Sequence, residues 1–370
     1  MAMNEKMTYA GVGVDYEAMD PFKRLAQLAG RETAKNILRL GFSEVEMSRG
    51  ESAYLMDAGD HYVAHVEEGL GTKDLVADAM HRLTGKSHYD RIAQCTVAMI
   101  VNDMITLGAL PLSVAMHLAV GTSSWFSDEN RGRDLIDGWK KACDLARCTW
   151  GGGETPTLKD IVHPDAVVLS GSAVGVVKPK SHLINGASLQ HGDAIVIIGS
   201  SGIHANGLTL AREIAGKLPN GYLSKLSDGR LYGDALLDPT TIYVSLVEDC
   251  FNEGVDIRYA VNITGHGWRK LMRATQSFAY VIDHIPVPHP VFSFIQEHGP
   301  VDDQEAYANL NMGAGFALYV GEGDVKKVLT IAHSLGMFAL RAGTIESSKV
   351  KRVILHPLGL EYLGSTLGVR

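Results

Sequence analysis

Three kinds of feature are scarce in this sequence of 370 residues, and each scarcity excludes a class of protein. The four cysteines form no CxxC pair, which argues against a disulfide framework or a structural zinc site and favours a reducing cytoplasm. Lysine and arginine (34) are outnumbered by aspartate and glutamate (42), and the net charge of −8 leaves no basic field for nucleic acid. No segment approaches the roughly 18 uninterrupted apolar residues of a membrane span. We therefore expect a cytoplasmic protein that binds neither nucleic acid nor a membrane.

The residues that are plentiful are those of a globular protein with many tight turns. Hydrophobic residues make up 46% of the chain and glycine occupies 40 positions. At about 150 residues per domain, the length predicts two domains. Strand-like and helix-like segments alternate, which predicts an α/β class, α+β in its two-domain arrangement. The polar stretch after Pro179 separates an N-terminal domain, 1–178, from a C-terminal domain, 179–370.

Hydrophobic periodicity predicts the elements of both domains. The N-terminal domain should contain a surface helix at 21–40, a strand at 62–66, a fully buried helix at 89–107, a helix at 128–147 and a β-rich run at 166–178. The C-terminal domain should open with a strand at 194–200, a turn and a helix at 208–218. Beyond these we expect helices at 240–252, from Trp268, at 291–298 and at 325–335, and strands at 258–264, 277–283, 315–320, 337–345 and 350–355.

Two polar residues, Asn102 and Asp103, interrupt the apolar segment MIVNDMITLGALP. A buried carboxylate without a partner costs several kcal/mol, so Asp103 should have a cation, a metal or a set of hydrogen-bond donors. This favours a functional site. The alternative is an aspartate that caps a neighbouring loop.

Two glycine-rich turns have the geometry of anion sites. Gly69-Leu70-Gly71-Thr72-Lys73 exposes backbone N–H groups beside a lysine, although a purely structural turn fits as well. The segment Gly199–Gly207 follows a buried strand, precedes a helix and includes His204 and Asn206, which can donate to an anion or move a proton. Gly85-Lys86-Ser87 is not a P-loop, because Met80 stands where its partner glycine should be.

Three carboxylates, Glu68, Asp103 and Glu154, lie beside glycine-rich turns or inside an apolar segment. Hard oxygen ligands of this kind suit magnesium bound to nucleotide phosphates. Spacing alone does not show that the three converge, and carboxylates beside surface turns are common.

Six motifs occur in an order that is more specific than any one of them. The sequence resembles the aminoimidazole ribonucleotide synthetase family, also called phosphoribosylformylglycinamidine cyclo-ligases, over nearly its whole length. TYAGVGVD (8–15) and LLDPTTIYV (236–244) add to this resemblance. The six motifs are EGLGTK (68–73), VNDMITLGALP (101–111), GGGET (151–155), GSSGIHANG (199–207), ITGHGW (263–268) and LNMGAGF (310–316).

The resemblance implies a subunit of two α/β domains that forms a homodimer through its N-terminal halves and needs ATP and Mg²⁺. It implies phosphorylation of an amide oxygen of a phosphoribosyl amidine, formylglycinamidine ribonucleotide, followed by closure of the imidazole ring in purine biosynthesis. The implied metal ligands are Glu68, Asp103 and Glu154, the implied catalytic residues are Lys73, His204 and Asn206, and the implied nucleotide-binding residues are Gly69, Gly71, Thr72, Lys73, Asn102, Gly151, Gly152, Gly153, Gly202, Thr264 and Gly265.

These residues match the chemistry that the resemblance implies. Phosphoryl transfer asks a protein mainly for positioning and charge neutralisation, which glycine amides, a lysine and carboxylates on magnesium supply. Proton transfer at the attacking amine needs a group that titrates near neutrality, and we expect His204 to be that group.

Several positions depart from the family pattern. Ala10 replaces a lysine, Glu68 and Cys95 replace aspartates, His266 replaces a glycine, and Pro156-Thr157-Leu158 replaces the methionine-proline that usually follows GGET. Because these changes lie in the site motifs, two alternatives stay open. One is a paralogue that phosphorylates a different small substrate, and the other is a nucleotide-binding protein without turnover.

Overall fold

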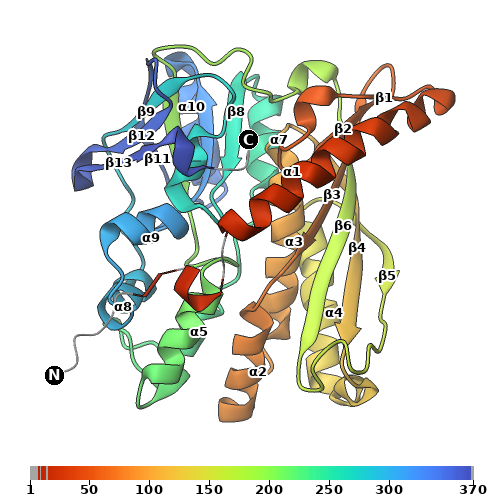
Figure 1. The fold of residues 1–370 in the computed structure, drawn as a ribbon, viewed down its shortest axis with the longest axis vertical. Coiled ribbons are helices and arrows are strands. Elements are labelled where there is room, and N and C mark those ends of the chain that lie inside the picture. Colours follow the sequence, from red (N-terminus) through yellow and green to blue (C-terminus); the bar gives the residue numbers. More distant parts are fainter. Residues whose placement is uncertain (1–6, 9, 14–15, 368–370) are drawn as a thin grey trace.

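The computed structural model describes residues 7–8, 10–13 and 16–367, which form two sheets with their helices (Figure 1). Tyr9, Val14 and Asp15 of the TYAGVGVD motif therefore lie outside the described residues. No described helix combines the length and the apolar character that crossing a membrane requires. The two-domain α/β class predicted from the sequence is confirmed.

The N-terminal sheet has six strands in the order β1-β2-β3-β6-β4-β5. The pair β4 and β5 is parallel, and the other neighbours are antiparallel. As a result, β3, β4 and β5 end at the same edge of the sheet. The strands are β1 (Ser43–Glu44), β2 (Tyr54–Asp57), β3 (Tyr62–Gly69), β4 (Leu110–Val120), β5 (Thr149–Glu154) and β6 (Val167–Val177).

Helices cover one face of this sheet. Helix α3 (Tyr89–Ile105) contacts β3, β4 and β6, α4 (Glu129–Leu145) packs on α3 and β5, and α2 (Lys73–Thr84) packs on α3. On its other sides α3 contacts α7 (Val244–Asn252) and β8 (Ile257–Asn262) of the C-terminal domain. This double packing explains why α3 is apolar around its whole circumference, as predicted.

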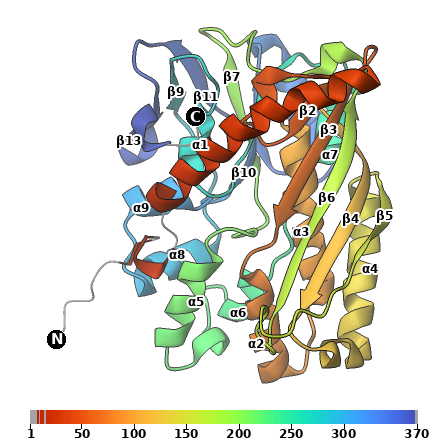
Figure 2. The ribbon, with the colours of Figure 1, turned by 45° about the vertical axis from the view of Figure 1, so that its right-hand side comes forward.

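The other face of the N-terminal sheet is open (Figure 2). Along β6, residues alternate between buried and more exposed, and Val168 and Val174 on the open face are 50% and 43% exposed. Leu112 of β4 is 52% exposed. Alternation of this kind is typical of a sheet that is covered on one side only.

The C-terminal sheet has seven strands in the order β13-β12-β9-β11-β7-β10-β8. Strand β7, between β11 and β10, is buried from Ala194 to Ile198, which matches the continuous apolar run predicted there. The other strands are β9 (Phe278–Ile282), β10 (Ala314–Val320), β11 (Ala339–Ser347), β12 (Arg352–Leu355) and β13 (Leu360–Leu363), with β7 at Ala194–Gly199. The helices are α5 (Leu208–Lys217), α6 (Tyr232–Leu236), α8 (Pro290–His298), α9 (Asp303–Asn309) and α10 (Val325–Ser334).

Several predicted elements need correction. The helix expected from Trp268 is a short 3₁₀ helix, Gly267–Met272, and the helix expected at 21–40 is α1 (Tyr16–Thr33) followed by a 3₁₀ segment, Ala34–Leu40. The glycines of GGGET form strand β5 rather than a turn. The periodicity of the sequence does not predict strand β4 or helix α2. The domain boundary at 178/179 falls between β6 and β7 and stays a prediction.

Candidate functional site

The glycine turn after β3 is tied directly to the C-terminal domain. Gly71 has a φ of 77°, which lets the chain turn sharply into α2. Lys73, at the start of α2, is fully buried, and its Nζ donates to the carbonyl oxygens of His204 and Asp238, each at 2.7 Å. The hydroxyls of Thr72 and Thr209 lie 3.4 Å apart. The EGLGTK turn, the GSSGIHANG loop and the LLDPTTIYV segment therefore meet at one place.

Asn102 strengthens the same junction. Its side-chain Nδ2 donates to Thr241 O at 2.8 Å, and its Oδ1 accepts from Tyr243 N at 3.0 Å. Both ends of the amide are thus used on the backbone of the LLDPTTIYV segment. In this structure Asn102 has a positioning role, and its binding of nucleotide stays a prediction.

Asp103 has the partners that its burial requires. The carboxylate is 8% exposed and accepts a hydrogen bond from Asn262 Nδ2 at 2.7 Å. Lys270 is itself buried. Burial lowers the pKa of its ammonium group, and the charge of Asp103 opposes this shift. Of the expected partners, a cation, a metal or a set of donors, the structure shows one donor, the Asn262 amide, and the role of Asp103 as a metal ligand stays a prediction.

Glu68 faces the same group of charges from β3. Burial, and then the charge of Asp103, raise the pKa of Glu68 from its ordinary 4.5 to about 7, against opposing effects of Lys270 and Arg273. Two carboxylates with mutually unfavourable charges are held together beside one buried lysine. This is an arrangement that a divalent cation stabilises.

Glu154 does not join these two carboxylates within one chain. The register places Gly69, Ser170, His117 and Glu154 side by side on β3, β6, β4 and β5. Three strand spacings of about 4.8 Å put Glu154 roughly 14 Å from Gly69. It is exposed on the open face, whereas Glu68 lies on the face covered by helices. Among the described residues, no group of three His, Cys, Asp or Glu side chains could hold a metal. The expectation that all three carboxylates gather is wrong for the single chain.

The glycines before Glu154 are required by backbone geometry. Gly152 and Gly153 have φ values of 130° and 158°. A Cβ on Gly153 would lie 2.0 Å from Met116 O on β4, so only glycine fits this close strand pairing. Gly151, Gly152 and Gly153 are exposed, and their binding of nucleotide stays a prediction.

The loop from Gly199 to Gly207 holds His204 in a left-handed conformation with a φ of 61°. Its Nε2 accepts from Ser201 N at 3.1 Å, and the side chain is only 3% exposed. Burial, and then the electrostatic influence of Lys73 and His289, lower the pKa of His204 to about 3. The expectation that His204 titrates near neutrality is wrong, because the imidazole is neutral at physiological pH.

Asn206 has unused hydrogen-bonding capacity. Its Oδ1 is buried and has no partner among the described residues. A buried acceptor without a partner is costly, so a bound group that donates to it would be stabilised. This fits a residue that faces a ligand. Gly202, which lies in the same loop, has a φ of 149°.

Three residues that are not among the predicted site residues hold this site together. Asn311 accepts from Ser200 Oγ at 3.0 Å and donates to Gly202 O at 2.9 Å, so it fixes the GSSGIHANG loop. Lys270 donates to Asn262 O at 3.3 Å and also to Thr264 Oγ1. Asn311 lies in LNMGAGF and Lys270 follows ITGHGW, so both motifs pointed to their neighbourhood. Nothing in the sequence marked Asn262.

The structure also shows the surroundings of three positions that depart from the family pattern. His266 has a φ of 70°, a conformation that favours glycine and accounts for the glycine usual there. Cys95 is fully buried, and its Sγ accepts from Thr240 N at 3.2 Å. It therefore packs against the LLDPTTIYV segment. Ala10 lies in a 3₁₀ turn, Ala10–Val12.

The family models of AIR synthase related proteins match residues 50–177 with the N-terminal domain and 190–356 with the C-terminal domain. Phosphoribosylformylglycinamidine cyclo-ligase of Methanocaldococcus jannaschii is 34% identical over 344 residues, 92% of this chain and 93% of the relative. The cyclo-ligase of Carboxydothermus hydrogenoformans is 34% identical over 365 residues, 95% of this chain and 99% of the relative.

A solved structure shows the same fold. T. maritima PurL complexed with ATP matches with a TM-score of 0.55 at 15% identity, over 85% of this chain and 46% of that one. With both family models matching in order and relatives about a third identical along almost the entire length, the chain belongs to the AIR synthase related family.

Proposed function

We propose that this protein is an ATP-dependent cyclo-ligase of purine biosynthesis, which converts formylglycinamidine ribonucleotide to aminoimidazole ribonucleotide. The curated relatives that bear this name extend over more than nine-tenths of the chain. The observation that carries the proposal is the pair Glu68 and Asp103 beside the buried Lys270, at the junction of both domains. Such a pair is suited to a nucleotide-bound metal ion rather than to structural packing.

The residues present fit Mg²⁺ with ATP. Magnesium is usually bound in proteins by one or two carboxylates together with water and substrate phosphates, so Glu68 and Asp103 would be enough without a third protein ligand. When bound, the ion would neutralise charge on the transferring phosphate. Glu154 would contribute only to a site at the open face of the sheet. The amides of Gly69, Gly71 and Thr72 would hold phosphate oxygens.

The reaction then follows from amide chemistry. The γ-phosphoryl group of ATP passes to the amide oxygen of the substrate and ADP leaves. An amine of the same substrate attacks the activated carbon, and the C–O bond breaks with release of phosphate. A neutral His204 would orient or accept a proton rather than act as a cation, and Asn206 Oδ1 would accept from a substrate N–H.

A second candidate within the same family is a kinase-like paralogue with a different small acceptor. It is favoured by the replacements at Ala10, Glu68, Cys95 and His266. ADP release with Mg-ATP, measured with and without formylglycinamidine ribonucleotide, separates the two. Strong stimulation by this substrate supports the cyclo-ligase. ADP release without stimulation supports the paralogue, and no ADP release under either condition supports a binding protein without turnover.

We also propose that the protein forms a homodimer through the open face of the N-terminal sheet and resides in the cytoplasm. Val168 and Val174 lie on this face and remain 50% and 43% exposed. A twin subunit would remove this apolar surface from water, since the most common assemblies are two-fold dimers with the same patch on both subunits. The cytoplasmic location rests on the low cysteine content.

Introducing a charge on the open face should therefore dissociate the dimer. We expect Val174→Glu to be a monomer at micromolar concentration, because the dimer would bury an unpaired carboxylate. Val350→Glu is the control, as Val350 is 52% exposed but lies in the C-terminal domain. Sedimentation equilibrium checks both variants. A parent protein that sediments at 39.9 kDa, the mass of one chain, would count against the dimer.

A further inference from the structure

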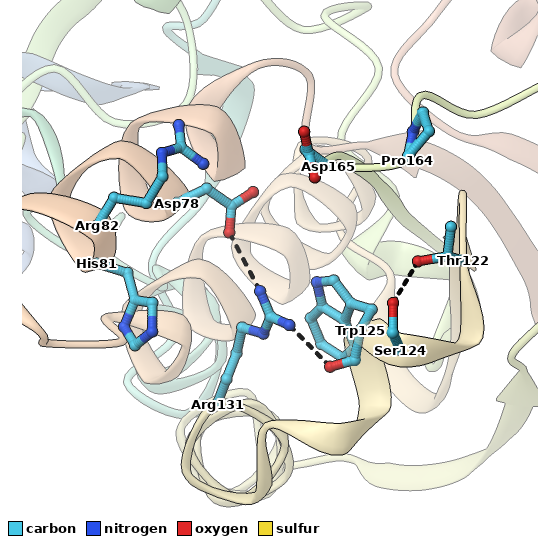
Figure 3. Close-up of a pocket in the computed structure, with 9 residues that line it drawn as sticks. All are labelled: Asp78, His81, Arg82, Thr122, Ser124, Trp125, Arg131, Pro164 and Asp165. Atoms are coloured by element: carbon cyan, nitrogen blue, oxygen red, sulfur yellow. Dashed lines mark hydrogen bonds and ion pairs between the residues drawn. The ribbon is translucent and has the colours of Figure 1, made fainter.

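A polar cavity of about 160 Å³, which none of the candidate-site residues lines, lies beside the segment that follows β4 (Figure 3). Its volume corresponds to about five water molecules. Helix α2, the segment after β4, helix α4 and the segment before β6 each contribute to its wall. The lining residues are Asp78, His81, Arg82, Thr122, Ser124, Trp125, Arg131, Pro164 and Asp165.

Four of these residues have a buried polar atom without a partner among the described residues. These atoms are Asp78 Oδ2, His81 Nδ1, Trp125 Nε1 and Arg131 Nε. Asp78 and Trp125 are only 5% and 6% exposed. Each unpartnered atom is costly, and four around one cavity are an unusual concentration. Trp125 and Arg131 offer donors, whereas Asp78 offers an acceptor.

Neighbouring contacts hold these groups in place. Arg131 lies 4.4 Å over the ring of Trp125, and its Nη2 donates to Trp125 O at 2.8 Å. Asp78 Oδ1 accepts from Tyr89 Oη at 2.9 Å, and Arg131 Nη1 is 3.8 Å from the same oxygen. His81 Nε2 is 3.3 Å from Asp128. Side chains held in this way lose little freedom when a ligand binds.

The charges around the cavity select the class of ligand. Arg82 and Arg131 disfavour a simple cation, whereas Asp78 and Asp165 disfavour a simple anion. Burial raises the pKa of Asp78 because it disfavours the charged carboxylate. A positive group beside Asp78 would stabilise this charged form. A compact molecule with an anionic and a cationic end satisfies both sides at once.

We propose that this cavity binds a small zwitterionic α-amino acid. Its carboxylate accepts from Arg131 Nε and Trp125 Nε1, and its ammonium group donates to Asp78 Oδ2. Glycine, alanine and serine are the smallest ligands of this kind. This site is independent of the proposed function, although Asp78 lies on the same helix as Lys73.

Calorimetric titration of the full-length protein with glycine, alanine and serine tests the proposal, with acetate and methylammonium as ligands that have one charge each. We expect at least one amino acid to bind and both singly charged ligands to bind at least about tenfold more weakly. Trp125→Phe keeps an aromatic side chain, although a smaller one, and removes one donor, so it should weaken binding about five- to tenfold, as expected for one hydrogen bond. Trp139→Phe is the matched control, because Trp139 Nε1 is also buried without a partner but lies outside the cavity.

Asp78→Asn provides a second test at the ammonium end. The variant keeps an oxygen that accepts from the Tyr89 hydroxyl. It should weaken amino-acid binding, and acetate should still bind more weakly than the amino acids. The proposal is overturned if none of the three amino acids binds, in which case water alone fills the cavity. It is also overturned if acetate binds as tightly as the amino acids, or if Trp125→Phe and Trp139→Phe have equal effects.

Discussion

Asp103→Asn should reduce ATP-dependent turnover by about 10²- to 10⁴-fold while the protein stays folded. The substitution keeps the shape of the side chain and an oxygen that can accept the hydrogen bond from Asn262 Nδ2. It removes the negative charge that a magnesium ion needs, and the loss of one positioned charged group has an effect of this size. Steady-state ADP release measures the rate, and circular dichroism with thermal unfolding measures the fold.

The matched control is Asp137→Asn, the same substitution at an exposed position of α4. It should keep the parental rate. If Asp103→Asn also turns over at the parental rate, Asp103 does not hold the metal, and the buried pair with Glu68 is structural.

Glu68→Gln should make the protein without metal more stable at pH 8 and leave its stability near pH 4.5 unchanged. Because burial raises the pKa of Glu68 from 4.5 to about 7, the folded state holds this proton more tightly than the unfolded state. The stability from this proton is present below pH 4.5 and is lost as the pH rises through about 7. At about 1.4 kcal/mol per pKa unit, the gain at pH 8 is at most about 3.5 kcal/mol. Urea unfolding across this pH range measures it.

Asp74→Asn separates this effect from metal binding. Asp74 is buried at the start of α2, and burial raises its pKa from 3.8 to about 7, so its variant should show a similar pH profile. Only Glu68→Gln should also abolish the added stability that Mg-ATP gives the parent at pH 8. Equal stability of parent and Glu68→Gln at pH 8 would show that Glu68 is not held in the raised-pKa state.

The sequence predicts the class of the fold and most of its elements because their periodicity is local. The all-round apolar character of α3 and the apolar run of β7 are visible without knowledge of what covers them. Strand β4 is not predicted from the sequence. The alternation of its residues between Val114 and Val120 indicates a strand only once it is known that one face of the sheet is covered. The 3₁₀ helix at 267–272 depends on tertiary contacts that its amphipathic sequence does not show.

Part of the candidate site is also visible in the sequence, and the rest depends on how distant segments pack. A carboxylate in an apolar helix indicated that Asp103 needs partners, but the identity of these partners, Asn262 and Lys270, depends on how the domains pack. The pKa of His204 depends on burial and on Lys73, which come from segments far apart in the sequence. The position of Glu154 on the opposite face follows from strand register, which motif order does not specify.

The transfer of an oxygen atom tests the central claim most directly. Formylglycinamidine ribonucleotide labelled with ¹⁸O at its amide oxygen is turned over with Mg-ATP, and the phosphate released is examined by mass spectrometry. If the amide oxygen is phosphorylated and then leaves, one labelled oxygen appears in each phosphate formed, and aminoimidazole ribonucleotide contains none of that label. Unlabelled phosphate, with ¹⁸O in water or retained in the product, would contradict the account.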